Sequence, residues 1–213
     1  MLTLRLMKTI IILLLAIQAQ AFASPSFCSL NNLLSKQVSY SSKGIDRSHI
    51  FKLGKITLAG LAVGTSDAAE VSSMANSFGG KNSCVWYLNK GNRNAQKRFS
   101  NYPLPYPSEK ANLSGFEDFM EEMISSGNFE SCVKENHFLA LGCNEMKHRG
   151  PTAMGMVLTF AGCSAQEASN IVNTLWGLNG VAESVRLEVI NQGVEYRQRY
   201  PQIAKQFQGL LEN

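Results

Sequence analysis

The amino-acid sequence predicts an all-α protein, a compact helical bundle with disulfide staples behind a cleaved leader. Apolar residues recur at helical spacing in several segments, most regularly after residue 111. Residues that commonly begin and end helices flank these segments. Five cysteines follow the leader, which is typical of a chain that is stabilised by disulfides.

Residues 1–23 have the layout of a secretory signal peptide. Arg5 and Lys8 precede the aliphatic run 9–17, and Ala23 is a suitable cleavage residue. The run is shorter than the roughly 20 apolar residues that cross a bilayer. We therefore expect an exported protein, periplasmic or extracellular, with no stable membrane insertion after cleavage.

The charge balance gives no reason to expect a nucleic-acid partner. The formal net charge is +4, and two of the positive charges belong to the leader. Sustained phosphate binding requires a clustered basic face. The nearest candidate is Lys90, Arg93, Lys97 and Arg98, which is more typical of a solvated helix face. No motif indicates a cofactor, so none is expected.

Residues 24–102 form an N-terminal half that we predict to be helical. The apolar pattern of residues 49–63 predicts a helix, although Gly54 and Gly60 each weaken that prediction. The segment 82–88 is rich in β-forming residues. A helical turn is favoured there because no partner strand is evident nearby.

Three prolines within residues 103–110 predict an extended connector between the two halves. Residues 111–213 then form a C-terminal helical half, and the two halves are expected to make one continuous domain. Ser164 and Glu167 form a capping box, and Pro151 occupies a first helical position. The predicted helices of this half span residues 115–125, 128–137, 152–161, 165–176, 183–199 and 201–211.

The cysteines predict two disulfides and one thiol. If residues 129–137 and 152–163 form antiparallel helices, Cys132 lies near Cys163, within the distance that a disulfide requires. Cys28 and Cys84 then form the second pair, which leaves Cys143 in a loop. This pairing is one of several that five cysteines allow.

Two alternatives involve the same cysteines and the neighbouring histidines. Cys132, His137, Cys143 and His148 repeat one spacing and could hold a structural zinc ion, although the tight spacing of zinc fingers is absent. The disulfide interpretation is favoured, so no metal is expected.

Cys143 is also a candidate catalytic nucleophile with His148 or His137 as its base. Lys147, His148 and Arg149 precede a predicted helix start and suit an anionic group such as a carboxylate. These three residues are the predicted binding site.

We favour a binding or accessory component of the cell envelope or of a secretion system over an enzyme. Its expected partner is another envelope or secreted protein, contacted through the loop 141–151 or the proline strap 102–107. The main alternative is a cell-envelope hydrolase that uses Cys143.

Overall fold

Residues 24–40, 48–63, 68–104, 113–177 and 183–213 are described by the computed structural model. The predicted leader at 1–23 and most of the predicted connector at 103–110 lie outside the described residues. No helix within the described ranges has both the length and the apolar character that crossing a membrane requires.

The chain folds around a six-stranded mixed sheet, so the predicted all-α bundle is wrong and the fold is α/β. The strand order is β1-β2-β3-β6-β4-β5, in which β3, β6, β4 and β5 run parallel and β1 and β2 are antiparallel to their neighbours. The strands are β1 (Gln37–Val38), β2 (His49–Leu53), β3 (Ile56–Ala62), β4 (Val85–Tyr87), β5 (Ser100–Asn101) and β6 (Phe138–Cys143).

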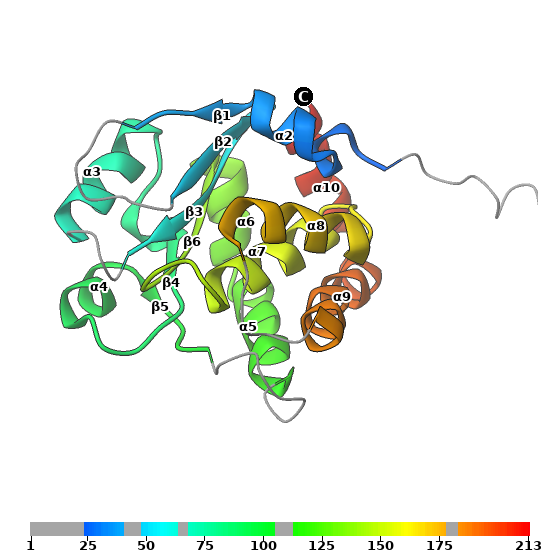
Figure 1. Cartoon of the computed structure of the whole chain (residues 1–213). Coiled ribbons are helices and arrows are strands. Elements are labelled where there is room, and N and C mark those ends of the chain that lie inside the picture. The colour runs from blue at the N-terminus through cyan, green and yellow to red at the C-terminus, as the bar shows by residue number, and fades with distance from the viewer. Residues whose placement is uncertain (1–23, 41–47, 64–67, 105–112, 178–182) are drawn as a thin grey trace, which may run out of the picture.

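Helices cover both faces of this sheet. Figure 1 shows α3 and α4 on one side and α5, α7, α8, α9 and α10 gathered on the other. The helical elements are η1 (Ser26–Cys28), α2 (Leu30–Ser35), α3 (Ala68–Ser77), η2 (Asn82–Cys84), α4 (Arg93–Arg98), α5 (Leu113–Ser125), α6 (Asn128–Glu130), the π-helical turn η4 (Ser131–Glu135), α7 (Arg149–Phe160), α8 (Ala165–Trp176), α9 (Glu183–Arg199) and α10 (Pro201–Glu212).

Strand β6 lies at the centre of the sheet, and its side chains enter two separate cores. Leu139 and Leu141 pack in the larger core with α5 and α7. Phe138 and Ala140 pack in the smaller core with α3. All six residues of β6 are buried. Strands buried on both faces are apolar throughout, so they lack the alternation by which a strand is recognised.

The segment 49–63 shows the same ambiguity, and its predicted helix is wrong. It forms the hairpin of β2 and β3, and all seven residues of β3 are buried. Gly54 lies in the two-residue turn with φ +50°, which glycine adopts without steric cost. A Cβ on Gly60 would lie 2.4 Å from the Trp176 ring, so glycine allows α8 to approach the strand.

The helical turn favoured for residues 82–88 is also wrong beyond Cys84. Residues 82–84 form η2, but residues 85–87 form β4. The partner of β4 is β6, where Val85 pairs with Ala140. Strand β6 lies about 50 residues further along the chain. A strand can therefore form at 85–87 although no partner strand is close in the sequence.

Two disulfides are present, but the pairing favoured from the sequence is wrong. The observed bonds join Cys28 to Cys163 and Cys84 to Cys132. Cys28 and Cys163 lie in the core beside α7, whereas Cys84 and Cys132 lie in the core beside α3. The predicted pairs, Cys132 with Cys163 and Cys28 with Cys84, would each join cysteines of different cores. These cores lie on opposite faces of the sheet, so neither predicted bond can form.

Replacing Cys84 with alanine tests this pairing. Cys84→Ala leaves Cys132 as a thiol that iodoacetamide labels once the non-reduced protein is denatured, and it leaves the Cys28–Cys163 bond intact, which peptide mapping of the non-reduced protein will detect. Release of Cys28 instead would contradict the structure.

Because the Cys84–Cys132 bond spans 48 residues, we expect the double variant Cys84→Ala/Cys132→Ala to lose about 4 kcal/mol of unfolding free energy in urea titrations.

Candidate functional site

The sheet topology places a crevice at the carboxyl ends of β4 and β6. These strands are parallel neighbours. The chain leaves β4 toward α4 on one face and leaves β6 toward α7 on the other (Figure 1). Adjacent loops that diverge in this way open a crevice, and ligands of open α/β sheets commonly bind there.

Two adjoining hollows occupy this position, and we call them together the switch crevice. One has a volume of about 360 Å³, the other of about 560 Å³, and Asn144 lines both. The lining residues are Asn89, Gly91, Asn92, Arg93, Asn94, Cys143, Asn144, Glu145, Lys147, His148 and Arg149.

One wall of the switch crevice is the turn from β6 into α7. Cys143 is the last residue of β6 and is 4% exposed. Met146, in the turn, has a φ of +50°, and His148 is the residue before α7. A Cβ on Gly150 would lie 2.3 Å from Met146 Sδ and 3.2 Å from Cys143 Sγ. Glycine therefore allows the buried thiol to pack against the first turn of α7.

The opposite wall is the loop from β4 to α4. The Asn92 side chain caps α4 by accepting hydrogen bonds from the backbone N–H groups of Asn94 (3.1 Å) and Ala95 (3.0 Å). Asn89 Oδ1 accepts a 2.8 Å bond from the N–H of Lys90. Such local bonds are the usual reason why asparagine occurs in tight loops. This wall is therefore held by its own side chains.

Tyr87 joins the two walls. Its side chain is fully buried, and its hydroxyl donates a 2.6 Å hydrogen bond to Asn144 Oδ1. Burial raises the pKa of Tyr87, while a hydrogen bond from the backbone N–H of Asn92 opposes that rise. Cys143 further raises this pKa and Arg149 lowers it. The Tyr87 hydroxyl thus lies within electrostatic reach of both the Cys143 thiol and the Arg149 guanidinium.

The switch crevice is electropositive. Among its described lining residues, Arg93, Lys147 and Arg149 are cationic and Glu145 is the one carboxylate. Lys147 forms an ion pair with Glu145. Arg149 Nε donates a 2.7 Å bond to the carbonyl of Leu104, the last described residue of the proline strap. The arrangement supplies more hydrogen-bond donors and positive charge than acceptors, which suits an anionic group.

The structure brings together four of the residues that the sequence singled out: Cys143, Lys147, His148 and Arg149 line one hollow. His137 lies elsewhere. It precedes β6, whose six residues span roughly 20 Å, and its Nδ1 lies 3.1 Å from the carbonyl of Val133. Of the two histidines proposed as a base for Cys143, only His148 remains a candidate.

The alternative zinc site is not formed. Cys132 is in a disulfide, and His137 and Cys143 lie at opposite ends of β6. The described ranges contain no group of three or more histidine, cysteine, aspartate or glutamate side chains that could hold a metal ion. Cys143 is the one cysteine outside a disulfide, since all five lie in the described part of the chain.

Sequence reasoning did not identify Tyr87, Asn89, Asn92 and Asn144 as residues of the site. Asn89 follows the apolar segment that contains β4, and Asn144 follows β6 directly. Polar residues just after two buried parallel strands meet at the same edge of the sheet. If the apolar runs at 85–88 and 138–143 are both taken as parallel neighbouring strands, the sequence predicts that Asn89 and Asn144 lie close together.

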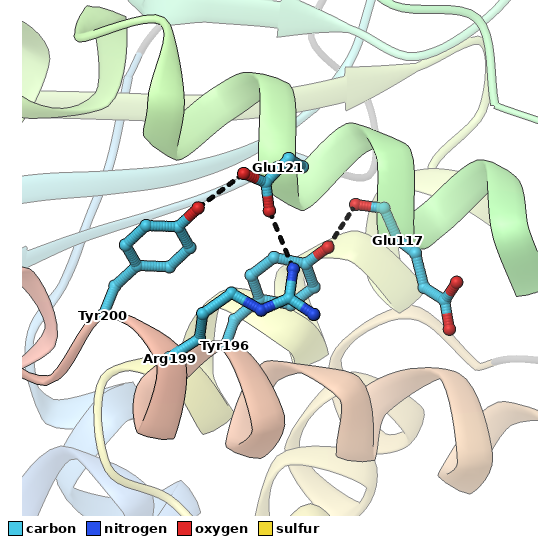
Figure 2. Close-up of polar contacts among 5 residues, drawn as sticks. All are labelled: Glu117, Glu121, Tyr196, Arg199 and Tyr200. Carbon is cyan, nitrogen blue, oxygen red and sulfur yellow. Dashed lines mark hydrogen bonds and ion pairs between the residues drawn. The ribbon is translucent and has the colours of Figure 1, made fainter.

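A second polar cluster joins α9 to α5, and Figure 2 shows how its side chains converge. The Tyr196 hydroxyl donates to the backbone carbonyl of Glu117 at 2.9 Å, and Arg199 binds the Glu121 carboxylate at 2.9 Å. Tyr200 donates a 2.5 Å bond to the same carboxylate. A backbone carbonyl and a paired carboxylate serve as the acceptors, so we assign this cluster to helix docking.

The helix-docking cluster has a defined pH dependence. The Tyr200 hydroxyl, and secondly Arg199, lower the pKa of Glu121. The resulting stabilisation is present above the ordinary glutamate pKa and is lost as the pH falls through the depressed value. We therefore expect Glu121→Gln to lower the melting temperature by about 1 to 3 °C at pH 7. The difference from the wild type should shrink toward pH 3 in a thermal unfolding series, and a constant difference would contradict this assignment.

No model of a protein family matches the chain, and no curated protein matches it significantly.

Proposed function

We propose that this chain is an exported binding protein of the cell envelope or of a secretion system, whose site is the switch crevice. The observation that carries this proposal is that Lys147, His148 and Arg149 line a hollow at the diverging ends of β4 and β6. Two disulfides and the predicted leader support export, because disulfides persist in oxidising compartments.

The chemistry of the lining residues supports a carboxylate as the group that enters. Arg149 and Lys147 supply positive charge, and Asn144 adds an amide. A hollow of about 360 Å³ accommodates a chain terminus or one acidic side chain of a partner, not a folded element. The partner is therefore a protein that presents a carboxylate to the loop after β6. Leu104 of the proline strap borders the same place through its bond to Arg149.

Paired peptides test this function. Short peptides that end in a free carboxylate should bind about tenfold more tightly than the same peptides with an amidated end, because charge-assisted hydrogen bonds are the stronger ones. Calorimetry or NMR titration of the oxidised protein measures the ratio. Equal affinity for both peptide forms would refute the carboxylate site.

Lysine variants provide the matched control. Lys147 pairs with Glu145 in the switch crevice, whereas Lys134 pairs with Glu130 on η4 and α6, outside the crevice. Lys147→Met should weaken binding of the free-carboxylate peptide about threefold to tenfold, through loss of one partly exposed charge. Lys134→Met, which removes a comparable surface ion pair, should leave that affinity unchanged.

A thiol-dependent hydrolase is the second candidate, and one observation favours it. Cys143 lines the same hollow as His148. In such an enzyme His148 would take the thiol proton, the sulfur would attack a carbonyl carbon, and the amine would leave with that proton. Water would then hydrolyse the thioester. The 4% exposure of Cys143 argues against easy access of a substrate to the sulfur.

Alkylation kinetics separate the two candidates. For a binding protein, we expect Cys143 to react with iodoacetamide no faster than an ordinary buried thiol at pH 6, because the thiolate is the reactive form. Rapid labelling at pH 6 that is abolished by His148→Ala but unaffected by His137→Ala would establish the hydrolase chemistry. In the binding protein, Cys143→Ala also retains the preference for free-carboxylate peptides.

A further inference from the structure

We infer that Tyr87 is the positioning residue of the switch crevice: by holding Asn144 Oδ1, it fixes the Asn144 amide as a donor and makes the site select carboxylates over neutral amides. This inference rests on the proposed carboxylate site and names what sets its specificity. Tyr87 lines neither hollow of the switch crevice, so it acts on a ligand through Asn144.

Tyr87 is rigidly held. It pairs with Gly142 of β6 and Asn101 of β5, and its carbonyl accepts a 3.0 Å bond from the N–H of Tyr102. Its ring belongs to the core beside α3 and has no measurable exposure. The hydroxyl therefore has one available position, at the end of a strand fixed on both sides.

The 2.6 Å bond decides which end of the Asn144 amide meets a ligand. An asparagine side chain has an acceptor oxygen and a donor NH₂ group, and rotation by half a turn exchanges them. Because the tyrosine hydroxyl donates to the oxygen, the NH₂ group is left for other partners. Those hydrogens attract a carboxylate, whereas a rotated amide would turn its oxygen toward the same anion.

The hydroxyl also joins the two walls. Tyr87 is the last residue of β4, from which the first loop leaves, and its hydroxyl donates to Asn144 in the loop after β6. One hydrogen bond thus links the two places from which the loops diverge. Loss of the hydroxyl leaves the sheet unchanged and frees the Asn144 amide to adopt either orientation.

The test uses acetate and acetamide as probes, which have nearly the same shape and differ in charge and donor capacity. The wild-type protein should bind acetate more tightly than acetamide in NMR titrations. Tyr87→Phe should lower that preference about tenfold, because the freed amide can accept a hydrogen bond from acetamide. In the same variant, the two Asn144 NH₂ resonances should broaden or shift without added ligand.

Tyr196→Phe is the matched control. Tyr196 is a buried tyrosine whose hydroxyl also donates to an oxygen, the carbonyl of Glu117 at 2.9 Å, but it lies on α9 in the helix-docking cluster. Tyr196→Phe should lower thermal stability to a similar degree and leave the acetate preference unchanged. A purely structural role for Tyr87 predicts that both variants behave alike in the titration.

The outcomes distinguish this inference from the proposed function. If the wild-type protein shows no preference for acetate over acetamide, the carboxylate site is wrong and the inference falls with it. If the wild type prefers acetate and Tyr87→Phe keeps both that preference and the Asn144 resonances, Tyr87 does not position the amide. In that case the proposed function stands and the inference is overturned.

Discussion

The pairing of β6 with both β3 and β4 is the constraint on which the structure depends. Before β6 is inserted, β3 and β4 lack their shared neighbour, and each would expose backbone groups that must be paired when buried. The inserted strand completes the sheet and divides the apolar side chains between two cores. It also fixes the register in which Tyr87 lies opposite Gly142, which brings the tyrosine hydroxyl to Asn144.

The two ends of the β4–β6 pair are built differently. At the amino ends, the Cys84–Cys132 disulfide joins η2 to η4 covalently. At the carboxyl ends, the loops diverge, and the Tyr87 hydroxyl at the end of β4 donates one hydrogen bond to Asn144 in the loop after β6. A covalent bond holds the amino ends, whereas the end with the switch crevice retains polar side chains that can exchange partners. The position of Cys143 agrees with this division, since it lies at the end where the chain forms no disulfide.

Local signals predicted the helices well and the strands poorly. The capping box of Ser164 and Glu167 and the αL glycine at 177 are visible in the sequence and are both present in α8. Strands β3, β4 and β6 are buried on both faces, so their apolar runs carry no period, and their partners are remote in the chain. The disulfide pairing followed from that mistaken helix packing. Cys143, Lys147, His148 and Arg149 are predictable because they lie close together in the sequence, whereas Tyr87 and Asn89 belong to the site only through the sheet topology.

The central position of β6 has a consequence for the order of assembly. In a chain that enters an oxidising compartment amino end first, Cys84 and Cys132 both arrive before β6, while Cys163 arrives after it. The first disulfide can therefore form while the sheet is still open. It then tethers the segment just ahead of β6 beside the start of β4, which shortens the loop that must close when the strand enters. Parallel strands that pair across long sequence separations fold slowly, and an early covalent tether is a direct way to guide the last strand into the middle of the sheet.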